Sequence, residues 1–170
     1  ITRFAMIDNS SRWILKLYLC IAMAFTGQAV VAQSFLPVEN NVTFDQVLAL
    51  PSEEPDATIA YGDSASQYGL LWTPKTDSNA PLVILIHGGC WLNSFDVNHS
   101  RPLATALNQA GFAVWSLEYR RTGDPGGGWP GTLEDIELAL SRLDLLSPYA
   151  IDTSQIAVAG HSAGGHLALM

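Results

Sequence analysis

One serine in this 170-residue chain has the surroundings of a catalytic nucleophile. Ser162 lies at the centre of the pentapeptide Gly-His-Ser-Ala-Gly, which directly follows the apolar run 155–159. A serine hydroxyl is a poor nucleophile until geometry and a neighbouring base activate it, and a sharp turn between a strand and a helix can present it. Gly160 and Gly164 fit such a turn because they have no Cβ to clash with nearby backbone. The pattern predicts acyl transfer through Ser162, and a glycine-rich turn with an incidental serine is the alternative.

A second glycine-rich segment could supply the groups that stabilise charge during this reaction. The residues His87-Gly88-Gly89-Cys90-Trp91 follow an apolar strand predicted over 81–86. The tetrahedral intermediate of acyl transfer carries an oxyanion that needs two preorganised donors, and backbone amides can provide them where no side chain obstructs the approach. We expect the first donor to be the amide of Ala163 and the second to be among the amides of Gly88, Gly89 and Cys90. A plain glycine turn after a strand is the alternative.

The histidines of these segments are expected to support the site and not to transfer protons. His87 opens the glycine-rich segment, where it can hydrogen-bond and fix the loop, and His161 would help to shape the pocket wall. His166 lies one helical turn after Ser162, so its side chain leans along the helix and a packing role is favoured. His99 lies in a polar loop, where the sequence identifies no partner for it. No spacing of histidine and cysteine suggests a metal site, and we expect no cofactor.

The segments around these residues predict strands that alternate with helices. The spacing of leucine and isoleucine predicts a helix over 132–146, opened by a capping box of Thr132 and Asp135. Ser100 is the expected N-cap of a helix over 101–110, with Pro102 in its first turn and Gly111 just past its end. The other predicted elements are a short helix near 44–50, strands over 58–61, 69–73 and 112–117, a buried strand over 155–159 and a helix over 163–170. This alternation indicates an α/β fold with a parallel sheet.

From about Ala60 to Met170 the chain resembles the α/β-hydrolase superfamily, in its His-Gly-Gly-x-Trp branch of arylformamidase-like, hormone-sensitive-lipase-like and feruloyl-esterase-like enzymes. The motifs that carry the resemblance are Tyr61-Gly62, 87–91, 118–121, 126–132 and 160–167. The resemblance implies a mostly parallel sheet with helices on both faces, and a Ser, Asp or Glu, His triad in that chain order. The triad acid and histidine would then follow Met170. We therefore expect a fold truncated before its last strands, which is inactive alone and has an exposed apolar edge beside the strand that precedes Ser162.

The loop 118–131 leaves the C-terminal end of its predicted strand, which is where open α/β sheets bind ligands. Trp91 and Trp129 are candidates for the walls of a pocket that takes an acyl or aryl group. Arg120 and Arg121 are candidates to brace this loop through Glu118 or Asp124. The alternative is that Trp129 only covers the core and that the two arginines are solvated.

These features predict a serine hydrolase that cleaves small carboxylic esters through an acyl-enzyme on Ser162. Aryl formamides and peptides are alternative substrates within the same fold. A catalytically inactive binding protein with this fold is an alternative of another class.

The N-terminal region differs from the rest of a chain whose 48% hydrophobic and 14% charged residues are typical of a globular protein. Basic residues precede the short apolar stretch 17–25, and a small-residue pattern ends at Ala32. They predict a signal peptide over 1–32, followed by a lead-in over 33–56 and the N-terminal part of a hydrolase domain over 57–170. We expect an exported protein, periplasmic or secreted, and an anchor formed by an uncleaved N-terminal segment is the alternative.

Without residues 1–32 the chain keeps five basic and 15 acidic side chains, a net charge of −10. This charge argues against nucleic acid and anionic membrane surfaces as partners, and no stable membrane span is expected after cleavage. Cys90 would be the only cysteine left, so any disulfide would join it to a cysteine outside this chain. The sequence leaves the oligomeric state open.

Overall fold

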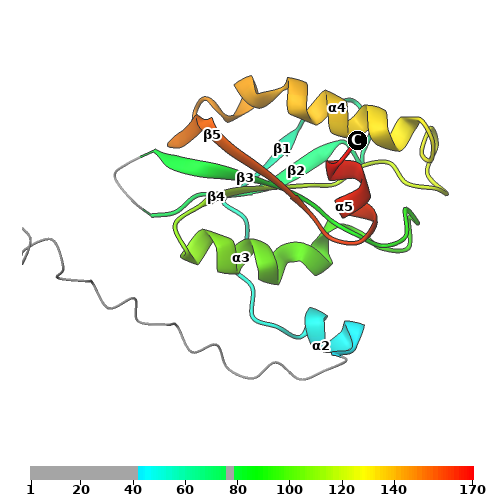
Figure 1. Cartoon of the computed structure of the whole chain (residues 1–170), viewed down its shortest axis with the longest axis horizontal. Coiled ribbons are helices and arrows are strands. Elements are labelled where there is room, and N and C mark those ends of the chain that lie inside the picture. Colours follow the sequence, from blue (N-terminus) through cyan, green and yellow to red (C-terminus); the bar gives the residue numbers. More distant parts are fainter. Residues whose placement is uncertain (1–41, 76–78) are drawn as a thin grey trace, which may run out of the picture. The chain divides into compact units, whose positions relative to one another are not determined.

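The structure, a computed structural model, describes residues 42–75 and 79–170. The predicted signal peptide and the first part of the lead-in lie outside these residues. The described strands form one mixed sheet in the order β1-β2-β4-β3-β5 (Figure 1). Their bounds are Ala57–Ala60 for β1, Tyr68–Trp72 for β2, Ala80–Ile86 for β3, Ala113–Leu117 for β4 and Ile151–Gly160 for β5.

Strand direction divides this sheet into two parts. β1 pairs antiparallel with β2, and β2 pairs antiparallel with β4. β3 lies between β4 and β5 and is parallel to both. The carboxyl ends of β4, β3 and β5 therefore meet at one edge, where the loops that follow them come together.

Helices cover both faces of the sheet, as expected for an α/β-hydrolase fold (Figure 1). α4 (Gly131–Ser141) and α5 (Ala163–Ala168) bury Ile136 and Leu167 in one apolar cluster. α3 (Arg101–Gln109) buries Ala104 in the other cluster. The short α2 (Phe44–Leu48) and two 3-10 turns, Val97–Ser100 and Leu143–Leu146, complete the described elements.

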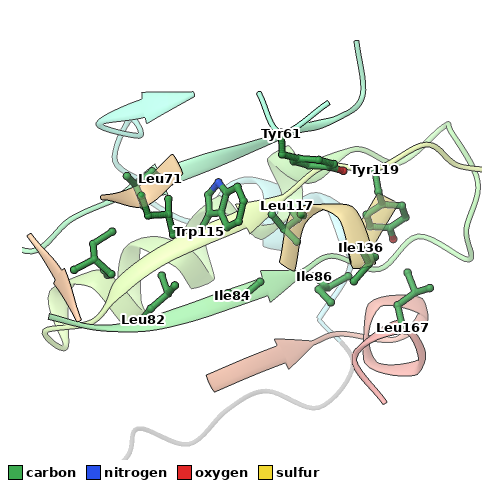
Figure 2. Close-up of a cluster of buried hydrophobic side chains, with 14 of the residues drawn as sticks. Tyr61, Leu71, Leu82, Ile84, Ile86, Trp115, Leu117, Tyr119, Ile136 and Leu167 are labelled. Atoms are coloured by element: carbon green, nitrogen blue, oxygen red, sulfur yellow. The ribbon is translucent and has the colours of Figure 1, made fainter. Parts of the chain in front are cut away.

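The larger core lies between the sheet and the helices α4 and α5. Four side chains of this core are fully buried, those of Ile84 and Ile86 in β3 and of Trp115 and Leu117 in β4 (Figure 2). Burial at about 25 cal/mol per Å² of apolar area makes such side chains the main source of stability. The two strands that carry the candidate loops are thus fixed by the best-packed part of the molecule.

The helix predicted over 132–146 differs from the observed one in its start and in its end. α4 begins at Gly131 and ends at Ser141, and a 3-10 turn follows. The predicted capping box is wrong, because Pro130 is the N-cap and no side chain caps the helix. The Thr132 hydroxyl instead donates to the Arg120 carbonyl at 2.6 Å. Asp135 is fully buried and accepts a hydrogen bond from Arg120. The side chains of Thr132 and Asp135 therefore form tertiary contacts in place of the local helix cap.

The capping of α3 differs from the sequence-based expectation, whereas the exposure of β5 agrees with the apolar edge expected beside the strand that precedes Ser162. Ser100 is the N-cap of α3, but its hydroxyl bonds the Val97 carbonyl and Ser116 and not the helix. The strand that precedes Ser162 was expected to be apolar with an exposed edge, and Ile156 and Val158 of β5 are 38% and 41% exposed. β5 is the outermost strand beside β3, so one of its edges faces no other described strand. No helix within the described ranges has the length and the apolar character to cross a bilayer.

Candidate active site

The turn formed by residues 160–164, here called the serine turn, joins β5 to α5. Ser162 has φ 53° and ψ −117°, a backbone conformation that non-glycine residues rarely adopt. The His161 amide donates to the Ile86 carbonyl at 3.1 Å, and the Gly164 amide donates to the His161 carbonyl at 2.9 Å. These bonds hold the Ser162 side chain exposed above the ends of β3 and β5.

Two glycines make this turn possible because backbone lies where their Cβ atoms would be. A Cβ on Gly160 would lie under 3.0 Å from the backbone of Gly164, and a Cβ on Gly164 would lie equally close to the carbonyl of Ile86. Backbone on both sides cannot move aside as a flexible side chain could. The serine turn is therefore determined by steric fit between main-chain segments.

The segment of residues 87–91, here called the glycine loop, follows β3 and lies directly against the serine turn. A Cβ on Gly88 would lie 2.8 Å from the His161 carbonyl oxygen and 3.1 Å from Ser162 Cβ. Gly89 has φ 114°, and Cys90 and Trp91 also have positive φ values, 53° and 57°. Three consecutive residues in this sparsely populated region mark a loop whose shape is imposed by its surroundings.

The four amides expected as oxyanion donors are free of protein acceptors. Within the described ranges, the backbone N–H groups of Gly88, Gly89, Cys90 and Ala163 donate to no main-chain or side-chain oxygen. A backbone donor without a partner is uncommon in a folded protein, and it is what a bound anionic oxygen requires. The structure thus brings the predicted donors and the predicted nucleophile to one place.

His87 is buried beneath the glycine loop, and its ring is held on all sides. Its Nδ1 lies 2.7 Å from the Gly88 carbonyl oxygen, and its Nε2 lies 3.0 Å from Glu118 Oε1. The Tyr119 ring stacks on the imidazole at 4.5 Å, and the Tyr119 hydroxyl donates to the His87 carbonyl at 2.8 Å. Burial raises the pKa of Tyr119, so the hydroxyl stays a donor.

The sequence did not identify Glu118 and Tyr119 as the partners of His87. Both residues follow β4, and β4 lies beside β3 in the sheet. The available signal was the tripeptide Glu-Tyr-Arg at the end of one apolar strand and a histidine at the end of another. Neighbouring parallel strands bring such residues together, but strand order cannot be derived from spacing alone.

The two arginines of the loop after β4 have different partners. Arg121 forms ion pairs with Glu118 at 3.3 Å and Asp124 at 3.6 Å, as the sequence suggested. Arg120 instead pairs with the buried Asp135 at 2.5 Å, and this hydrogen bond raises the pKa of Arg120. Arg120 therefore fastens the loop to α4, and Arg121 fastens it to the network under the glycine loop.

A cavity of about 300 Å³ opens beside the glycine loop and α5. Trp91 and Trp129, the two predicted pocket residues, both line it. His166 also lines it and is exposed, with its ring edge-on to Trp91 at 5.5 Å, so its contact is with a pocket wall and not with the core. The remaining lining residues are Cys90, Thr122, Gly128, Thr132, Leu133, Leu167 and Met170.

A second cavity of about 330 Å³ lies on the α2 side of the glycine loop and includes His161 in its lining, as predicted for a pocket wall. His99 lines it as well, and its ring lies edge-on to that of His87 at 5.3 Å. Burial, and then the neighbouring His87, lower the pKa of His99. Within the described residues no cluster of histidine, cysteine, aspartate and glutamate has the geometry to hold a metal ion.

Parallel strands that end in a glycine loop and a strained serine turn, with helices on both faces, define an α/β-hydrolase fold. A family model confirms this assignment, because residues 70–170 match BD-FAE. The chain belongs to the BD-FAE family.

Individual relatives agree with this assignment. The probable carboxylic ester hydrolase LipM of Mycobacterium tuberculosis is 32% identical over 66% of this chain and 27% of its own length. Kynurenine formamidase of Drosophila melanogaster is 29% identical over 64% of this chain and 35% of its own. The crystal structure of esterase B from Lactobacillus rhamnosis covers 95% of this chain and 48% of its own, with a TM-score of 0.61 and 25% identity. The chain thus spans between about a quarter and half of these proteins.

Proposed function

We propose that the protein carrying this chain is a serine hydrolase that cleaves small carboxylic esters through an acyl-enzyme on Ser162. One observation carries the proposal: Ser162, at a strained turn, lies against a glycine loop whose amides have no protein acceptor. The similarity to carboxylic ester hydrolases supports the same chemistry. The Ser162 Oγ would attack the ester carbonyl, and the amide of Ala163 with one of the loop amides would bind the oxyanion.

The proton from Ser162 must pass to a base that the described residues do not supply. His87 cannot take it, because both of its ring nitrogens are engaged, one by Gly88 and one by Glu118. No side chain of the described residues forms a hydrogen bond with Ser162 Oγ. We place the base and its orienting carboxylate in the portion of the full-length protein that follows Met170, as the chain order of this fold requires.

The test is hydrolysis of p-nitrophenyl acetate and p-nitrophenyl octanoate by the full-length protein. Ser162→Ala is expected to lower kcat about 10⁶-fold, because a whole catalytic unit fails when its nucleophile is removed. A fluorophosphonate probe should label the peptide that contains Ser162, while Ser154→Ala, on exposed β5, leaves labelling unchanged. Full activity in Ser162→Ala would reject the mechanism, and an absence of turnover and labelling in the unaltered protein would favour a binding role.

Aryl formamides are the second candidate substrate class. The similarity to a kynurenine formamidase and the two tryptophans of the 300 Å³ cavity favour them. A flat aromatic leaving group would stack on such walls. Formanilide assayed beside p-nitrophenyl acetate distinguishes the two classes when each kcat/KM is divided by the rate constant of the uncatalysed hydrolysis, because the nitrophenyl ester is intrinsically more reactive.

We further propose that the protein is exported after cleavage behind Ala32. The basic residues, the short apolar stretch and the small-residue pattern of the sequence support this proposal. Intact-mass measurement of the protein recovered from its native host tests it: a chain beginning at Gln33 is expected, and a retained N-terminus would indicate an anchor.

A further inference from the structure

The hydrogen bonds around His87 determine its protonation state. Nδ1 lies 2.7 Å from the carbonyl oxygen of Gly88, and a carbonyl oxygen can only accept. Nδ1 must therefore carry a proton. A neutral imidazole has only one N–H group, so in a neutral ring Nε2 would have no proton and could only accept a hydrogen bond. In a charged ring Nε2 also carries a proton and can donate it.

The partner of Nε2 is a carboxylate whose other neighbours are all donors. Glu118 Oε2 accepts from the Val97 amide at 3.0 Å, and Oε1 accepts from the Tyr119 amide at 2.9 Å. The Arg121 guanidinium lies 3.3 Å from Oε1. Two backbone donors and a permanent cation favour the ionised form of a buried carboxyl group. Because an ionised carboxylate only accepts, Nε2 must donate to it.

We infer that His87 is a buried imidazolium, and that its charge positions and polarises the Gly88–Gly89 peptide as an oxyanion donor. Within the described residues the charges nearby balance, since His87 and Arg121 face Glu118 and Asp124. The other titratable groups around the pair are the stacked Tyr119, the edge-on His99, Tyr68, whose pKa is raised by burial and by the Glu118 charge, and Tyr61, whose hydroxyl donates to the Glu118 carbonyl at 2.6 Å.

The functional consequence follows from the geometry of a peptide group, and it rests on the proposed esterase function. The carbonyl of Gly88 and the N–H of Gly89 point in opposite directions because the peptide is planar and trans. The bond from the His87 ring fixes the Gly88 carbonyl and so aims the Gly89 N–H away from the ring. A charge-assisted bond to the carbonyl also makes the N–H of the same peptide a stronger donor. His87 is thus a positioning residue that acts on the oxyanion through Gly89.

The protonation state can be measured without any assay of activity. In ¹⁵N NMR spectra of the full-length protein at neutral pH, both ring nitrogens of His87 should have the shifts of protonated nitrogens. His87→Gln identifies its signals by their loss. A spectrum with one protonated and one bare ring nitrogen overturns the inference, whether or not the protein hydrolyses esters.

The variant Glu118→Gln separates a charged ring from a neutral ring bonded to a protonated carboxyl. A glutamine can donate to Nε2 as a protonated carboxyl would, so it should leave a neutral ring unchanged. If the ring is charged, Glu118→Gln should make it neutral in the spectrum and lower kcat roughly 10-fold to 100-fold with little change in KM, less than the loss of a whole oxyanion donor. Glu54→Gln, the same change at an exposed carboxylate, is the matched control. If the ring becomes neutral in Glu118→Gln and kcat is unchanged, the charge plays no part in oxyanion binding and the inference is wrong. Ester hydrolysis that is absent from the unaltered protein would reject the proposed function and leave the NMR result to decide the protonation state.

Discussion

The serine turn and the glycine loop form the two sides of the candidate site, and they are held by different forces. The serine turn is fixed by main chain packed against main chain, at Gly160 and Gly164. The glycine loop is fixed from below by buried, charged side chains, with His87 and Glu118 at the centre. An atom added to a glycine of the serine turn would clash at any pH. The glycine loop depends on hydrogen bonds between buried groups, so a change of charge should disturb it more than a change of shape. The following variants test this difference.

Gly164→Ala should have the largest effect on stability. Its Cβ would lie under 3.0 Å from the Ile86 carbonyl, so α5 or β3 must shift, and we expect a loss of about 3 kcal/mol in the free energy of unfolding. The matched control is Gly111→Ala, where φ is 99° but no atom lies within 4 Å. It should lose only about 1 kcal/mol from its backbone conformation. Equal losses in urea denaturation would show that steric fit does not dominate the serine turn.

Tyr119→Phe should weaken the glycine loop without any change of shape. It removes the buried hydroxyl that donates to the His87 carbonyl at 2.8 Å, and we expect a loss of about 1.5 kcal/mol. Tyr149→Phe is the control, because within the described residues the Tyr149 hydroxyl forms no hydrogen bond. If the two variants unfold at the same urea concentration, the hydroxyl contributes nothing to the loop.

Ser162→Gly should stabilise the protein while it removes the nucleophile. Ser162 has φ 53° and ψ −117°, and glycine adopts this conformation with less strain, for an expected gain of about 1 kcal/mol. Ser162→Ala also lacks the hydroxyl but keeps its Cβ, so it should show no such gain. A higher melting temperature for Ser162→Ala than for Ser162→Gly would contradict strain at this residue.

Asp124→Asn should have the smallest effect, and one that depends on pH. Burial tends to raise the pKa of Asp124, but bonds from the Arg121 amide and Asn93 and the charge of Arg121 outweigh it, so the net pKa is lowered below 3.8. A lowered carboxyl pKa stabilises the fold above the unfolded-state pKa, and this contribution is lost as the pH falls through the folded-state pKa. The variant should lose about 0.5 kcal/mol at neutral pH and nothing in strong acid. A loss of the same size at both extremes of pH would contradict this origin.

The same contrast explains what the sequence could predict. The serine turn was predictable because its residues lie within five positions and its requirement for glycine is local. The strands were predictable from apolar runs, within one residue at most ends, although β5 extends from Ile151 to Gly160. The support of the glycine loop was not predictable, because Glu118 reaches His87 only through the pairing of β3 with β4. Asp135 was misassigned for the same reason, since a local cap and a distant arginine compete for one carboxylate.

The order of the strands also sets the order in which the site can be built during synthesis. Every group of the network under the glycine loop, from His87 to Asp124, precedes β5 in the chain, yet β5 must reach back past β4 to pair with β3. Such long-range parallel pairing is slow, because loop closure comes before its contacts form. A chain emerging from the ribosome can therefore complete the glycine-loop donors and their support before it contains Ser162 and the other donor, the amide of Ala163. The hydroxyl of Ser162 meets them only when the central sheet has closed around β3.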